Sequence, residues 1–89
     1  MALSFINPTR SFDERNNYIR FWAHDGAIEV ACYLEVAALK IINPDIKPTR
    51  AGILEEFDKS ISRIHEVTQR VYSKNRIGSY ACTVTAHNF

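Results

Sequence analysis

Five polar side chains follow one another at intervals of three or four residues in the second half of the sequence. We refer to them as the helix-edge set, which comprises Asp58, Ser62, His65, Gln69 and Tyr72. On an α-helix, this spacing places side chains along one edge. A serine, a histidine and an aspartate together are the residue types of a nucleophilic hydrolase. This edge is therefore the first candidate for catalysis or for binding a ligand.

The spacing within the helix-edge set argues against a catalytic triad. Asp58 and His65 are seven positions apart, which is about 10 Å along a helix that rises ~1.5 Å per residue. A carboxylate at that distance does not orient the imidazole. Ser62 would lie in the middle of the helix, without the strained turn that exposes a nucleophilic serine. We expect no catalytic residue, and we keep a site at Asp58, His65 and Tyr72, in a small enzyme or a ligand-binding domain, as the alternative.

A second group of side chains alternates along two neighbouring segments that have the pattern of β-strands. We call this group the aromatic face, and its members are Tyr18, Arg20, Trp22, His24, Glu29 and Tyr33. Tryptophan, tyrosine and arginine are enriched at the energetic centres of protein interfaces. Monomers seldom expose such a patch without a use for it. The pattern favours association with a protein partner, above all a homodimer across a two-fold axis.

Two other interpretations of the aromatic face stay open. Aromatic side chains and an arginine on a sheet can stack on the bases of single-stranded nucleic acid. However, the sequence has no recognition motif for nucleic acid, and its formal net charge of +1 gives little attraction to phosphates. In the remaining interpretation, the N-terminal arm or a short helix covers the face, or Trp22 simply stacks on Arg20.

Histidine and cysteine residues are scattered along the sequence. His24, His65 and His87 fit no metal-ligand spacing, and Cys32 and Cys82 lie in strand-like segments outside any CxxC motif. We expect no metal, no cofactor and two buried thiols. A disulfide would be geometrically feasible if the two strands were neighbours, although a reducing cytoplasm would oppose it.

The length and composition indicate one small globular domain. Its 89 residues allow only a modest stability margin. A hydrophobic fraction of 46% with 24% charged residues argues against a disordered chain. The N-terminal segment lacks the regions of a secretory signal, and no window reaches the ~18 apolar residues of a membrane-spanning helix. We expect a cytoplasmic protein that does not enter a membrane.

A hairpin is predicted around Asp25-Gly26, because this dipeptide separates two alternating runs. Pairing outward from this turn places Phe21 opposite Val30, with aliphatic residues on one side of the hairpin and the aromatic face on the other. A shift of one residue would turn the whole apolar side outward. The aliphatic side is therefore expected to face the core.

Residues 49–74 have the spacing of one long amphipathic helix. The apolar stripe consists of Ile53, Leu54, Phe57, Ile61, Ile64, Val67, Val71 and Tyr72. On the opposite side, Glu55 precedes Lys59 by four residues, and Glu66 precedes Arg70 in the same way. This order of charges stabilises a helix. Because the helix is apolar on one side only, it must pack against the sheet.

These elements predict an α+β fold of two layers in the order β-β-β-α-α-β. An antiparallel sheet of three or four strands is covered on one face by one long and one short helix. The single domain spans residues 1–89 and divides into an extended arm (1–10), a β-meander (11–34), a short helix (35–42), the long helix (49–74) and a last strand (78–86).

Several short motifs carry a resemblance to a known family. They are Phe21-Trp22, Asp25-Gly26, Leu34, Leu39, Phe57-Asp58, Ile64-His65, Val71-Tyr72, Gly78-Ser79-Tyr80 and the terminal Phe89. Over nearly its whole length the chain resembles DUF1488, a small bacterial family of unknown function. Members often carry an acidic residue where this chain has Asn88. The resemblance implies a fold but no activity, because its motifs are core and turn residues.

Overall fold

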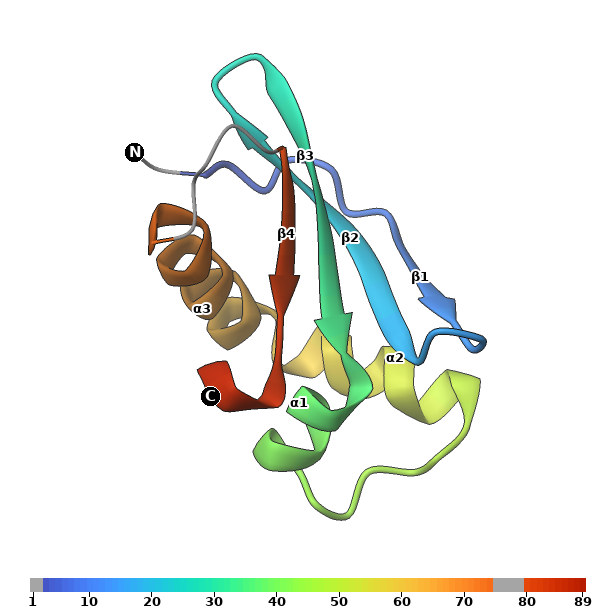
Figure 1. The fold of residues 1–89 in the computed structure, drawn as a ribbon. Coiled ribbons are helices and arrows are strands. Elements are labelled where there is room, and N and C mark those ends of the chain that lie inside the picture. Colours follow the sequence, from blue (N-terminus) through green and yellow to red (C-terminus); the bar gives the residue numbers. More distant parts are fainter. Residues whose placement is uncertain (1–2, 75–79) are drawn as a thin grey trace.

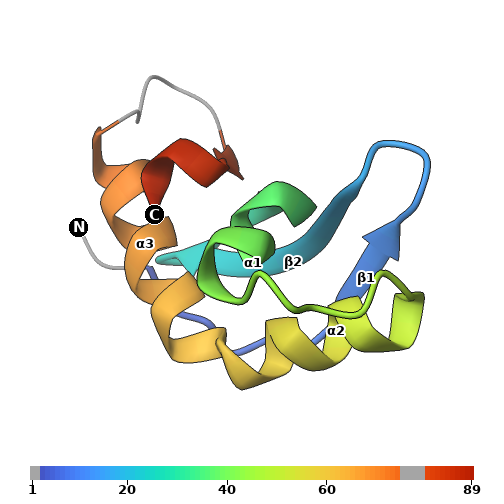
Figure 2. The ribbon, with the colours of Figure 1, turned by 90° about the horizontal axis from the view of Figure 1, so that it is seen from below.

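The computed structural model describes residues 3–74 and 80–89. In this part of the chain, a four-stranded sheet is covered on one side by three α-helices (Figure 1). The elements in chain order are β1 (Arg10–Asp13), β2 (Tyr18–Asp25), β3 (Ile28–Glu35), α1 (Val36–Ile42), α2 (Arg50–Lys59), α3 (Ile61–Lys74), β4 (Ala81–Val84) and the 3-10 helix η1 (Ala86–Asn88). The α+β class expected from the sequence is confirmed. Figure 2 shows the three helices grouped on one side of the strands.

The strands lie in the order β1-β2-β3-β4, but the sheet is mixed. β1 pairs with β2, and β2 with β3, in the antiparallel sense, whereas β4 runs parallel to β3. The expectation of a purely antiparallel sheet is therefore wrong at its last strand. The reason is α3, which carries the chain back along the sheet before β4 begins (Figure 1), so that β3 and β4 are joined by a crossover. Positions 78 and 79 of the expected last strand lie outside the described residues.

The hairpin between β2 and β3 forms with a register two residues away from the expected one. Asp25 pairs with Ile28, and Phe21 pairs with Cys32 instead of Val30. The turn consists of Gly26 and the next residue, and Gly26 adopts a φ of +63°, as the first central position of a type II′ turn requires. Asp25 stays in the strand, where its carboxylate accepts a hydrogen bond from a tyrosine of α3 at 2.8 Å. A shift of two residues keeps every side chain on its expected side.

The helix expected over residues 49–74 is divided into α2 and α3 at Ser60. Ser60 lies outside helical geometry, with φ −100° and ψ 13°. Its hydroxyl donates to Glu56 Oε2 at 2.8 Å, and Asn43 Nδ2 donates to Oε1 of the same carboxylate at 2.8 Å. The break allows α2 to cross the end of the sheet while α3 runs along it (Figure 2).

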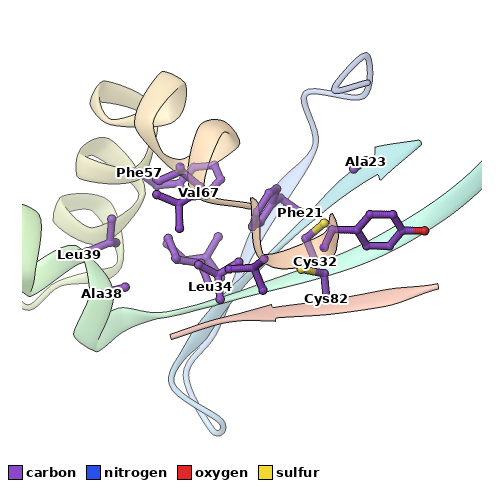
Figure 3. Packing of buried hydrophobic residues seen from close by; sticks show 14 of the residues in the cluster. Phe21, Ala23, Cys32, Leu34, Ala38, Leu39, Phe57, Val67 and Cys82 are labelled. Carbon is purple, nitrogen blue, oxygen red and sulfur yellow. The ribbon is translucent and has the colours of Figure 1, made fainter. Parts of the chain in front are cut away.

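The core lies between the helices and the aliphatic side of the sheet. Phe21 and Val30 are 3% and 0% exposed, as the sequence predicted for that side. Figure 3 shows Phe57 and Val67 above Phe21, and the two cysteine side chains together at one end of the cluster. Cys32 and Cys82 are register partners in neighbouring strands, and both are free thiols.

The N-terminal arm packs beside β2 and on the helix side of the sheet. Ser4 forms an antiparallel bridge with His24, with N–H to O distances of 2.8 and 2.9 Å. Leu3 is buried in the core, and its amide donates to Gln69 Oε1. Because α1 also contributes to the core, through Ala38 and Leu39, neither the arm nor the short helix covers the aromatic face.

Candidate functional site

The aromatic face is an uncovered sheet surface with two ordered pairs of side chains. Tyr18 and Tyr33 meet edge to face, with ring centroids 4.9 Å apart and planes at 65°. The Arg20 guanidinium lies 4.9 Å from the centroid of the Trp22 ring, a cation–π contact that contributes about 0.5–1 kcal/mol at an exposed site. The four side chains form a raised ridge over β2 and the neighbouring part of β3.

Small side chains lie beside this ridge. In the register of β3 and β4, Ala31 is adjacent to Ala81, and Thr83 follows two residues later. Side chains two residues apart on a strand point to the same side of the sheet. The part of the face over these three residues is therefore lower than the ridge, which includes Tyr33 of β3. We refer to Ala31, Ala81 and Thr83 as the trough.

The remaining two members of the aromatic face lie near the hairpin turn. His24 and Glu29 are register partners on β2 and β3. Glu29 is exposed, whereas His24 Nδ1 is buried without a hydrogen-bond partner among the described residues. Arg20 and Glu29 give the face charges of opposite sign, with Arg20 in the middle of the ridge and Glu29 near the hairpin turn.

The structure separates the members of the helix-edge set. Tyr72 is buried, and its hydroxyl donates to Asp25 Oδ2 at 2.8 Å. Gln69 accepts a hydrogen bond from the arm and donates to Ser73 Oγ at 3.0 Å. Ser62 is exposed to solvent. These three residues hold the fold or face water, so the set does not form one site.

The other two members, Asp58 and His65, line a hollow of about 310 Å³ between the arm, β2 and the α2–α3 junction. We call it the arm hollow. Its apolar walls come from Phe5, Phe21, Trp22, Phe57 and Ile61, and its polar rim includes Asn7 and Thr9. The helix-edge set predicted from the sequence includes Asp58 and His65 of this hollow, but not the walls from the arm, because the arm approaches the helices only in the folded chain.

His65 is held in the arm hollow by aromatic rings. The imidazole stacks on Phe5 with ring centroids 3.8 Å apart and planes at 7°, and its centroid is 6.3 Å from that of Phe21. Burial lowers the pKa of His65 below its usual value, because a charged imidazole loses hydration there. The ring is therefore neutral at pH 7, with one N–H donor and one acceptor.

Asp58 is held at the rim by an arginine of β1. Arg10 Nε and Nη2 donate to the two carboxylate oxygens at 3.0 and 2.8 Å. These hydrogen bonds lower the pKa of Asp58. Both oxygens are engaged by the guanidinium, so Asp58 is not poised to orient His65 as in a catalytic triad.

The cysteines are not nucleophiles in this fold. Burial raises the pKa of Cys32 to about 12, with a further contribution from Cys82, and burial raises the pKa of Cys82 to about 11. Among the described residues, no group of three or more His, Cys, Asp or Glu side chains could hold a metal ion. None of the described helices has the length and apolar content that spanning a membrane would need.

Comparison with known proteins identifies the family of this chain and a crystal structure with a similar fold. No curated protein matches the sequence significantly. A crystal structure of a protein of unknown function from the DUF1488 family, from Shewanella loihica PV-4, has a TM-score of 0.76 to this chain. The two share 16% sequence identity over 90% of each chain, so the likeness is one of fold. The family model described as "Protein of unknown function (DUF1488)" matches residues 3–83, and the chain therefore belongs to the DUF1488 family.

Proposed function

We propose that this protein acts without catalysis, by association of two copies through their aromatic faces. The observation that carries the proposal is the uncovered side of the sheet, on which Tyr18, Trp22 and Tyr33 stand beside a trough of small residues. Trp, Tyr and Arg are the residue types that contribute most energy at interfaces. An apolar surface of this kind gains stability when a partner removes it from water.

A second copy suits this surface because the face is complementary to itself. In a two-fold interface, if residue i of one copy contacts residue j of the other copy, then residue j of the first copy contacts residue i of the second. A ridge beside a trough satisfies this condition, since the ridge of each copy can lie in the trough of the other. The opposite charges of Arg20 and Glu29 add electrostatic complementarity, which favours one orientation over others.

Sedimentation velocity over roughly 1–100 μM protein tests the proposal, a range that corresponds to binding free energies of about 5–8 kcal/mol. The wild-type chain is expected to change from monomer to dimer within it. Trp22→Ala and Tyr33→Ala should each keep the chain monomeric. Tyr80→Ala is the matched control, because Tyr80 is an exposed aromatic, 50% accessible, that precedes β4 and does not belong to the aromatic face.

Two results would overturn the proposal. One is a wild-type chain that stays monomeric over the whole concentration range. The other is a dimer that Trp22→Ala and Tyr33→Ala leave unchanged while Tyr80→Ala disrupts it, since the interface would then lie elsewhere. Circular dichroism of each variant would establish that the fold is intact before the sedimentation data are compared.

A further inference from the structure

We propose that the arm hollow binds a neutral, planar aromatic or heteroaromatic molecule of one or two rings. The hollow is separate from the trough and from most of the aromatic face, with Trp22 as the residue common to both. The inference therefore does not rest on self-association. It follows from the size of the hollow, from its walls and from its charge.

The size limits the ligand to a small molecule. Ligand sites in proteins typically measure about 300–1,000 Å³. At about 310 Å³, the arm hollow is at the lower end of that range. Its walls come from three segments that are far apart in the sequence, so the concave shape is a product of the tertiary fold.

The walls favour a flat ring over a flexible aliphatic chain. Phe21 and Phe57 meet with ring centroids 5.3 Å apart and planes at 60°, while Phe5 and His65 form a parallel stack. Aromatic rings interact best with other rings, in offset-stacked or edge-to-face arrangements. A planar ligand can make both kinds of contact in this hollow.

The charges favour a neutral ligand with hydrogen-bonding groups. Asp58, the carboxylate at the rim, is neutralised by Arg10 through two hydrogen bonds. A charged ligand would lose its hydration without finding an unpaired counter-ion, which is costly. The neutral imidazole of His65 offers one donor and one acceptor to a heteroatom on the ring.

An NMR titration of the ¹⁵N-labelled chain with adenine and with 7-azaindole tests the inference. Both probes are expected to give saturable shifts of the Phe5, Trp22 and His65 amide signals. Cyclohexanol, which is neutral but not planar, serves as the ligand control and should shift these signals only weakly.

Four variants distinguish binding in the hollow from binding elsewhere. Ile61→Trp fills the hollow, and Thr9→Trp blocks its rim at an exposed position that carries little risk to folding. Each should weaken probe binding about tenfold or more, equivalent to about 1.4 kcal/mol. Arg70→Trp places the same ring on the exposed side of α3 that faces away from the hollow, and it should leave binding unchanged. Tyr33→Ala should also leave it unchanged, whatever that variant does to the dimer.

The inference is overturned by any of three results. The probes could give no saturable shifts up to their solubility limits. The shifts could persist in Thr9→Trp and Ile61→Trp, so that the probes bind outside the hollow. Cyclohexanol could bind as tightly as the planar probes, so that the site would be a general apolar surface.

Discussion

His65 is the residue whose protonation is most directly tied to the fold. Its imidazole is stacked on Phe5 in the arm hollow, and burial lowers its pKa. In the unfolded chain a histidine takes up a proton near its usual pKa of about 6.5, whereas the folded chain does so only at lower pH. As the pH falls through about 6.5, the unfolded state therefore binds more protons than the folded state. The free energy of unfolding decreases as a result.

The lowered pKa of His65 predicts that the protein loses stability in acid. Between pH 7 and pH 5, the urea midpoint of unfolding should fall for the wild-type chain and fall less for His65→Phe, which keeps an aromatic ring in the stack. His87→Gln is the matched control, because His87 is exposed. Equal pH dependence in His65→Phe and the wild type would show that another group controls acid sensitivity.

In α2, close packing against the preceding connector requires a glycine at position 52. The side chain of Thr49 caps α2 by accepting a hydrogen bond from the Gly52 amide at 3.0 Å. A Cβ atom at Gly52 would lie 2.7 Å from the carbonyl oxygen and from the Cβ of Lys47. The connector before α2 therefore approaches the first helical turn too closely for any other residue.

Replacing Gly52 tests whether the connector approaches the first turn of α2 too closely for a larger residue. Replacing a helical glycine by alanine usually stabilises a protein by roughly 0.5–1 kcal/mol. Gly52→Ala should instead lower the free energy of unfolding by about 1 kcal/mol or more, because the connector must move to relieve the overlap. Urea unfolding at pH 7 measures the effect, with Ser62→Ala as an exposed helical control that should change it little. A stabilised Gly52→Ala variant would contradict the close approach.

Local patterns predicted the faces of the elements better than their connections. Alternation along β2 and β3 was sufficient to divide aliphatic from aromatic side chains, because each strand has a period of two. The helical ion pairs Glu55–Lys59 and Glu66–Arg70 also form, with N–O distances of 3.3 and 3.6 Å. Such predictions succeed because the interacting residues are close together in the sequence.

The features that the sequence did not predict depend on contacts between distant residues. The parallel direction of β4 follows from the path of α3 across the sheet. The helix break at Ser60 involves Asn43, which lies before α2. The arm hollow requires the arm to meet α3, where Phe5 stacks on His65 across 60 positions of sequence. None of these contacts leaves a periodic pattern in the sequence.

At the scale of the whole molecule, the two faces of the sheet differ in composition and in what they pack against. The aliphatic side, with residues such as Ile19 and Leu34 fully buried, forms the core with the helices. The aromatic side contributes little to that core. Substitutions on the aromatic face should therefore weaken association, and they should lower the stability of the single chain only by the contacts they remove, such as the Tyr18–Tyr33 ring pair, worth about 0.5–1.5 kcal/mol.

This division predicts a thermal stability that depends on protein concentration. Association stabilises the native state by mass action, because the unfolded chain does not form the interface. The Tm of the wild-type chain should rise as its concentration increases from roughly 1 to 100 μM, whereas the Tm of Tyr33→Ala should not depend on concentration. Differential scanning fluorimetry at several concentrations measures both, with Tyr80→Ala behaving as the wild type. A wild-type Tm that does not depend on concentration, or a Tm that rises equally in Tyr33→Ala, would contradict association through the aromatic face.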